Sequence, residues 1–151
     1  IDNGQFPEAE EVDMNALVRR TAEDMEEIYA YRNMRFTLAE QGRLTVRMNP
    51  SLAGSVVANL VKNAFVHGDE GGEVTVDIAP QRFTVCNSGA GGPLDAGHIF
   101  DRFYQGAKKE GSTGLGLAVV DAVCRLYGLK VAYSYMDKRH CFTIDFRTAK
   151  K

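Results

Sequence analysis

The chain has 151 residues, of which 44% are hydrophobic and 25% are charged. This length and composition predict one compact domain with a buried core, and they exclude a repeat array or a disordered tail. The formal net charge of -2 supplies no overall field for gripping nucleic acid or an anionic membrane, so any anionic ligand must be held locally. No apolar run reaches the roughly 18 to 20 residues of a membrane-crossing helix. We therefore expect no nucleic-acid partner and no direct membrane contact.

The three cysteines, Cys86, Cys124 and Cys141, are an odd number at wide and irregular spacing. This arrangement is typical of neither a disulfide framework nor a zinc site, so the sequence predicts reduced, cytosolic thiols. The chain begins with Ile1 instead of Met, which indicates a piece cut from a longer protein.

The first regular pattern begins at Asp13, an expected helix N-cap. Apolar residues follow at i, i+3, i+4 and i+7 spacing over residues 14–29, which predicts an amphipathic helix. Apolar and polar residues then alternate over residues 36–38 and 44–48, on either side of a Gln-Gly turn. This alternation predicts two strands paired as a hairpin.

A second helix is predicted over residues 50–67, ended by Gly68. Alternation over residues 74–78 and 83–85 predicts a second hairpin.

Glycine is distributed unevenly, because eight of the 15 glycines fall between residues 89 and 116. After this stretch the sequence predicts a third helix over residues 115–127, with Gly128 in the C-terminal capping position. A last hairpin is predicted from residues 131–135 and 142–146. The predicted fold is an α+β two-layer sandwich, with three main helices on one face of a mixed, mostly antiparallel sheet.

Four short polar residues interrupt the apolar pattern of the second helix. Ser55, Asn59, Asn63 and His67 recur every four residues, so they form one polar stripe. A solvated face is the ordinary explanation, but solvated faces are usually made of Lys and Glu. Asn is a poor helix former, so two of them in mid-helix indicate a specific role. Their carboxamide oxygens suit Mg²⁺, which prefers oxygen ligands and keeps water and phosphate oxygens in its shell.

Asn87 is a second candidate functional residue. It continues the phase of Phe83 and Val85, so its side chain should be buried, where an amide could contact a purine edge. An Asn that begins a turn before Ser88 and Gly89 is the alternative explanation.

A glycine-rich segment, residues 111–117 (GSTGLGL), runs into the third helix. Free backbone N–H groups at a helix N-terminus predict a phosphate site. Residues 106–113 lack the Lys of a P-loop, and Val119 occupies the third glycine position of the dinucleotide fingerprint, so neither of these motifs fits.

Taken in order, these features resemble the ATP-binding catalytic domain of two-component sensor histidine kinases, in the superfamily shared with gyrase and heat-shock chaperones. Four boxes of that family are matched in its order: the N box by residues 59–67 (NLVKNAFVH), the first glycine box by 87–91 (NSGAG), the F box by 99–104 (IFDRFY) and the second glycine box by 114–117 (GLGL). The resemblance spans residues 10 to 147 and implies a flexible ATP lid over residues 92–113. Phe100, Arg102 and Phe103 would brace that lid.

The resemblance also implies a role for each matched residue. Asn63 would be the Mg²⁺ ligand, with Asn59 and His67 as further catalytic residues beside the phosphates, and Asn87 would contact the adenine amino group. The ATP-binding set that it implies is Asn59, Lys62, Asn63, His67, Asn87, Gly89, Gly91, Phe103, Thr113, Gly114, Leu115, Gly116 and Leu117.

The chain departs from the family pattern at several positions. Asn87 stands where the family usually has Asp, so a charge-assisted hydrogen bond to adenine becomes a neutral one, worth roughly half as much. Val66 replaces an often basic residue, and residues 139–142 (RHCF) replace a frequent Gly-Thr pair before the last strand's Phe. Asn59 stands where the superfamily's ATPases typically hold Glu, and an amide cannot activate water.

The function implied is Mg-ATP binding and phosphoryl donation to a histidine on a separate dimerisation and phosphoacceptor domain, in two-component signal transduction. The histidines present, His67, His98 and His140, all lie in the matched domain, so we expect the acceptor domain to be absent. Two alternatives stay open: a degenerate nucleotide-sensing module that binds without transfer, and an ATPase of the same superfamily.

The expected organisation is a linker remnant with a first edge segment over residues 1–12, the catalytic domain over 13–147 and a tail over 148–151. The expected partners are the chain's own acceptor domain and, indirectly, a response-regulator receiver domain. By the same resemblance, the chain is expected to be the cytoplasmic part of a membrane-anchored sensor kinase.

Overall fold

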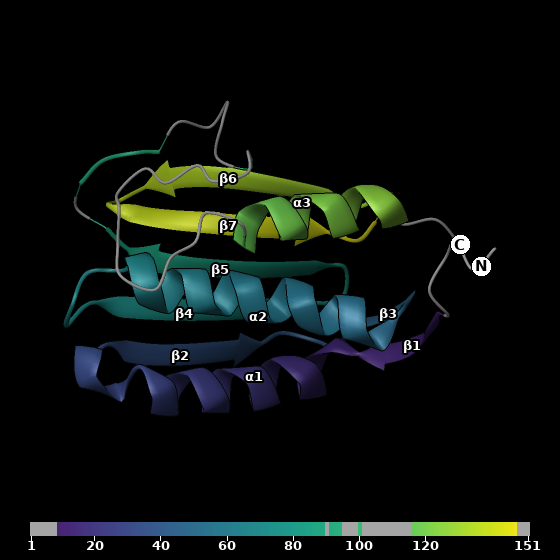
Figure 1. The fold of residues 1–151 in the computed structure, drawn as a ribbon, viewed down its shortest axis with the longest axis horizontal. Coiled ribbons are helices and arrows are strands. Elements are labelled where there is room, and N and C mark those ends of the chain that lie inside the picture. The colour runs from purple at the N-terminus through teal and green to yellow at the C-terminus, as the bar shows by residue number, and fades with distance from the viewer. Residues whose placement is uncertain (1–8, 90, 95–99, 101–115, 148–151) are drawn as a thin grey trace.

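The computed structural model describes residues 9–89, 91–94, 100 and 116–147 (Figure 1). These residues form seven strands, three α-helices and one 3₁₀ helix. In chain order the elements are β1 (Glu10–Asp13), α1 (Met14–Ile28), η1 (Ala30–Arg32), β2 (Arg35–Glu40), β3 (Thr45–Met48), α2 (Pro50–His67), β4 (Glu73–Ala79), β5 (Arg82–Ser88), α3 (Gly116–Tyr127), β6 (Lys130–Met136) and β7 (Arg139–Asp145).

Five strands form one sheet in the order β2-β4-β5-β7-β6, and β1 and β3 form a separate two-stranded sheet. β2 runs parallel to β4, and the other neighbouring pairs of the larger sheet are antiparallel. The three α-helices cover one face of this sheet (Figure 1). The structure therefore confirms the predicted α+β sandwich.

Two of the three predicted hairpins form, and one prediction is wrong. β4 pairs antiparallel with β5, and β6 pairs antiparallel with β7. The hairpin predicted from residues 36–38 and 44–48 does not form, because β2 pairs with β4 while β3 pairs with β1. Alternation identifies a strand with one buried face, but it carries no information on which strand lies beside it.

Asn15 explains why the chain leaves the larger sheet between β2 and β3. Its side-chain N–H groups donate to Glu40 Oε1 at 2.8 Å and to the carbonyl of Gly42 at 3.0 Å, and its amide oxygen accepts from the N–H of Leu44 at 2.8 Å. Gly42 has a φ of 139°, which residues with a side chain rarely adopt. These contacts hold the connection against the start of α1, so β3 continues beside β1.

The helix boundaries follow from capping residues. Asp13 caps α1 as predicted, because its Oδ1 accepts from the N–H of Ala16 at 3.2 Å. Asn49 caps α2 in the same way and accepts from the N–H of Leu52 at 3.1 Å. α2 ends at His67, its predicted boundary. Among the described residues, no helix is both long and apolar enough to cross a lipid bilayer.

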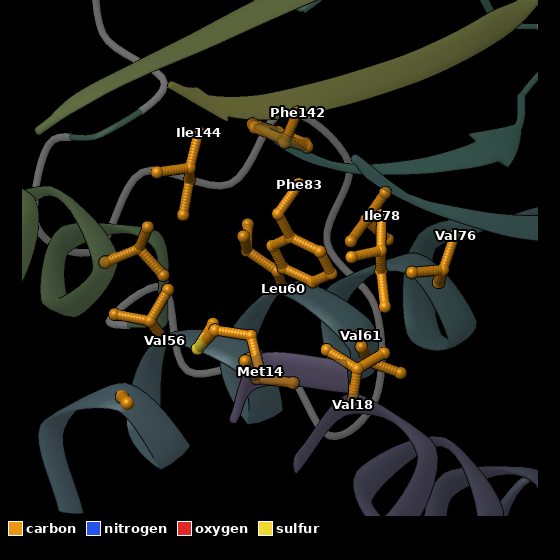
Figure 2. Packing of buried hydrophobic residues seen from close by; sticks show 14 of the residues in the cluster. Met14, Val18, Val56, Leu60, Val61, Val76, Ile78, Phe83, Phe142 and Ile144 are labelled. Atoms are coloured by element: carbon orange, nitrogen blue, oxygen red, sulfur yellow. The ribbon is translucent and has the colours of Figure 1, made fainter. Parts of the chain in front are cut away.

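The hydrophobic core lies between the sheet and the helices (Figure 2). Alternate residues of each central strand face the helices, since successive side chains of a strand point to opposite faces. The buried residues of this core include Met14, Val18, Val56, Leu60, Val61, Val76, Ile78, Phe83, Phe142 and Ile144. Because residues of α2 contribute to this core along most of the helix, the polar positions of α2 have a fixed orientation.

A disulfide joins Cys86 of β5 to Cys141 of β7. The two residues are direct partners in the strand register, although 55 positions separate them in the sequence. This corrects the expectation of three reduced thiols, which considered spacing along the chain and not the pairing of strands. Cys124 is free and buried in α3, and burial, assisted by the charge of Asp121, raises the pKa of its thiol to about 12.

Candidate functional site

The predicted polar stripe lies along α2 beside its buried positions. Asn59 and Asn63 are partly exposed, whereas the adjacent Leu60 and Ala64 are buried. The Nδ2 group of Asn59 donates to the carbonyl of Ser55 at 2.7 Å, which fixes the orientation of the carboxamide. The Asn59 amide oxygen and the second hydrogen of its Nδ2 group can consequently interact with another element or with a ligand.

The first residue of α3 lies against this stripe. A Cβ placed on Gly116 would come within 2.9 Å of Asn59 Oδ1, so the absence of a side chain allows α3 to begin beside Asn59. The first N–H groups of a helix have no partner within the helix and carry the positive end of its dipole. The stripe on α2 and the start of α3 together form a place suited to an anionic group.

The C-terminal end of α2 meets the end of β5. A Cβ on Gly68 would lie 3.3 Å from the Cβ of Asn87, and the N–H of Asp69 donates to the carbonyl of Ser88 at 3.1 Å. Asn87 is only 2% exposed, which confirms its predicted burial. Its Nδ2 group donates to the carbonyl of Ser88 at 3.1 Å, so its amide oxygen is the end that can accept from a ligand.

The turn between β6 and β7 contacts the residue that follows β5. The N–H of Gly89 donates to the carbonyl of Lys138 at 2.8 Å, and the carbonyl of Gly89 accepts from Tyr135 Oη at 2.9 Å. The imidazole of His140 packs so closely that a Cβ on Gly89 would lie 2.5 Å from its Cδ2 atom. Glycine is therefore required at position 89 by close contact.

His140 is buried beside the aromatic residues of β6. Burial lowers the pKa of its imidazole below the usual 6.5, and the negative charge of Asp69 opposes this shift. The ring is consequently neutral at pH 7, and Tyr133 Oη lies 2.7 Å from its Nδ1 atom. Motif matching does not single out Tyr133, Tyr135 or His140 as site residues. The sequence nevertheless contained a signal for the two tyrosines. They alternate with Val131 along one strand and so face the same side, where their hydroxyls should point inward and need partners.

Some of the remaining predicted site residues lie outside the part of the chain that the structure describes. Lys62 and Gly91 are exposed, His67 is partly exposed at the end of α2, and Leu117 packs against the core. Phe100 of the F box contacts Phe142 edge to face, with ring centroids 6.1 Å apart. Those that lie outside the described residues are Phe103, Thr113, Gly114 and Leu115. Most of the predicted lid, and Arg102 with it, lies outside them too.

A cavity of about 340 Å³ lies at the other end of the larger sheet, where its lining includes Met48, Pro80 and Phe146. β5 begins at that end and reaches Ser88 at the opposite one. The cavity is therefore separate from the candidate site.

Comparison with known proteins identifies the family. A sequence model described as "Histidine kinase-, DNA gyrase B-, and HSP90-like ATPase" matches residues 48–150. The heme sensor protein HssS of Staphylococcus saprophyticus is 26% identical over 158 residues, an alignment that covers 100% of this chain and 34% of HssS. The chain thus spans about a third of the length of that sensor protein.

Two solved structures share the fold at 25% identity. The mycobacterial sensor histidine kinase MprB aligns with a TM-score of 0.75, over 89% of this chain and 95% of that one. The catalytic domain of histidine kinase ThkA aligns with a TM-score of 0.76, over 93% of this chain and 96% of that one. The chain belongs to the histidine kinase-, DNA gyrase B- and HSP90-like ATPase family, and its fold is that of histidine kinase catalytic domains.

Proposed function

We propose that this chain binds Mg-ATP and donates the γ-phosphoryl group to a histidine on a separate dimerisation and phosphoacceptor domain. The observation that carries the proposal is the contact between Asn59 and Gly116, because it joins the two motifs matched to phosphate-binding boxes. The buried amide of Asn87, beside the C-terminal end of α2, adds a group for the base. Phosphoryl transfer depends mainly on positioning and charge neutralisation, which such an arrangement can supply.

Asn63 would hold Mg²⁺. It lies one helical turn from Asn59 and is partly exposed, and its amide oxygen is a hard, neutral ligand of the kind that Mg²⁺ accepts beside water and phosphate oxygens. Bound there, the metal would neutralise charge on the phosphates. Asn59, through the second hydrogen of its Nδ2 group, and His67, through an imidazole N–H, lie one turn to either side and would orient the phosphates by donating hydrogen bonds.

Asn59 favours transfer over hydrolysis. An amide cannot take a proton at neutral pH, and the Nδ2 group of Asn59 already donates to the carbonyl of Ser55. This residue therefore cannot activate a water molecule for attack on the phosphate. Net ATPase activity is accordingly the less supported alternative.

Family membership also supports proposals for the domain bounds, the partners and the location of this chain. We assign the catalytic domain to residues 13–147, with a linker and first edge segment over residues 1–12 before it and a tail over 148–151 after it. The partners would be the acceptor domain of the same protein and, through it, a response-regulator receiver domain. The domain would act in the cytoplasm, as part of a membrane-anchored sensor kinase.

Asn63→Ala tests the metal and nucleotide assignment. Isothermal titration calorimetry of the whole chain with ATP, with and without Mg²⁺, should show Mg-dependent binding that the variant abolishes, while its melting temperature stays within a few degrees. Ser51→Ala, an exposed substitution in the first turn of α2, is the control and should bind normally. If the Asn63 variant retains Mg-dependent binding, the polar stripe is only a solvated face.

The degenerate nucleotide-sensing module is the second candidate function, because Asn87 replaces the family's usual Asp with a neutral group. Supplying a separate acceptor domain together with Mg-ATP distinguishes the two candidates. Labelled phosphate on the acceptor histidine supports the kinase, whereas tight binding without transfer supports the sensing module.

A further inference from the structure

The β6–β7 hairpin holds the backbone at two described residues that follow Asn87, the proposed nucleotide contact. Gly89 hydrogen-bonds through its N–H to Lys138 and through its carbonyl to Tyr135 Oη. Five residues further along, the N–H of Leu94 donates to Tyr133 Oη at 2.9 Å. Gly89 and Leu94, which both follow β5, are therefore each attached to the hairpin.

His140 joins these two points. Its ring is stacked with that of Tyr133, at a centroid distance of 5.8 Å, and lies 4.8 Å from the ring of Tyr135. The same ring contacts Gly89 closely enough to exclude a Cβ, and His140 is the register partner of Asn87. One imidazole thus fills the space between the hairpin tyrosines and the backbone beside Asn87.

The hydrogen-bond directions in this group follow from its chemistry. The N–H of Leu94 can only donate, so Tyr133 Oη accepts from it. The hydroxyl proton of Tyr133 can then be donated to Nδ1 of His140, 2.7 Å away, provided that this nitrogen carries no proton. The order is Leu94 N–H to Tyr133 Oη, and Tyr133 O–H to His140 Nδ1, which requires the neutral imidazole.

We propose that Tyr133 and His140 are positioning residues for the nucleotide site, which together hold the backbone of Gly89, two residues after Asn87, and that of Leu94. The inference rests on the proposed function, and neither residue needs to touch the nucleotide. A rigid backbone matters here because Asn87 offers only a neutral hydrogen bond to the base. Fixing the site before binding reduces the ordering that the ligand would otherwise have to impose.

Tyr133→Phe tests the role of the hydroxyl, since the ring and its stacking remain. Tyr127→Phe is the matched control, because Tyr127 Oη also accepts from a backbone N–H, that of Asn49 at 3.0 Å, away from the site. Both variants lose a hydrogen bond from a backbone N–H, and Tyr133→Phe also loses the one to His140, so its melting temperature should fall by the larger amount. In calorimetric titration with Mg-ATP, Tyr133→Phe should raise Kd about fivefold or more, whereas Tyr127→Phe should stay within about twofold.

The pH dependence of binding separates positioning from a general loss of structure. Among the described residues, the titratable or charged groups around the ring are Tyr133 and Tyr135 on β6 and Asp69 after α2. A protonated ring carries hydrogen on Nδ1 and cannot accept from Tyr133, so the wild-type Kd should rise as the pH is lowered into the acid range. Tyr133→Phe should lose this additional rise, and Tyr127→Phe should keep it.

His140→Asn is a second variant that keeps a polar side chain but cannot titrate in this range, so it should also lose the acid-dependent rise. The inference is overturned if Tyr133→Phe matches the wild type in both Kd and pH profile, or if Tyr127→Phe weakens binding equally. A wild-type chain that binds no nucleotide at any pH would instead refute the proposed function, and the positioning role with it.

Discussion

At the scale of single residues, Gly116 shows how the absence of one Cβ brings two motifs together. In Gly116→Ala the new carbon would lie 2.9 Å from Asn59 Oδ1, so the carboxamide must move, although alanine is the better helix former. Moving a positioned group by roughly 1 Å is enough to lower the affinity of a site by about tenfold to a hundredfold. We expect that loss of Mg-ATP affinity in titration calorimetry, with little change in melting temperature.

Gly54→Ala is the control for this substitution. Gly54 lies inside α2, and apart from the nearby backbone of that helix no atom lies within 4 Å of a Cβ built on it. The variant should gain about 0.5–1 kcal/mol of stability and bind Mg-ATP as the wild type does. Unchanged affinity in Gly116→Ala would show that its contact with Asn59 has no part in nucleotide binding.

At the scale of elements, α1 is held to the end of β2 by charged and amide side chains. Arg19 donates to both carboxylate oxygens of Glu40, at 2.8 and 2.7 Å, and Asn15 donates to one of them at 2.8 Å. These hydrogen bonds, those from Arg19 above all, lower the pKa of Glu40 from 4.5 to about 2. Because the folded-state pKa lies below the unfolded one, Glu40 stabilises the fold above about pH 4.5, and this contribution disappears as the pH falls towards 2.

We therefore expect Glu40→Gln to be less stable than the wild type near neutral pH, with the difference shrinking as the pH falls through this window. Urea unfolding followed by circular dichroism, at a neutral and an acidic pH, measures both free energies of unfolding. Glu23→Gln, an exposed change on the same helix, should match the wild type at both pH values. A difference between Glu40→Gln and wild type that does not change with pH would contradict the assignment.

The elements also show how far the sequence could predict the molecule. The bounds of α1 and α2, and the burial of Asn87, could be predicted, because caps and periodicity are local properties of the chain. The pairing of β2 with β4 could not, since it depends on Asn15 holding the chain after Glu40 against α1. Motif spacing placed Asn59 and Gly116 in the candidate site. It could not reveal the contact of His140 with Gly89, which arises only when β7 pairs with β5.

At the scale of the whole molecule, the C-terminal end of α2, the end of β5 and the β6–β7 turn lie at one end of the sheet, whereas β1 and the end of β7 lie towards the other (Figure 1). None of the histidines in the described residues is placed as a ready acceptor. His140 is 9% exposed and enclosed by Gly89 and Tyr133, and His67 belongs to the stripe that would face the phosphates. His98 lies outside the described residues.

We accordingly expect that the chain incubated alone with Mg-ATP acquires no phosphohistidine, because the enclosed His140 and the phosphate-facing His67 are not presented for in-line attack and the family resemblance places His98 in the approach to the F box. Mass spectrometry at neutral to alkaline pH, where phosphohistidine survives, measures this directly. The same reaction with an added acceptor domain is the positive control and should label the acceptor histidine. Phosphate on a histidine of this chain would contradict the division into donor and acceptor domains, and its position would identify which of the three histidines takes part in transfer.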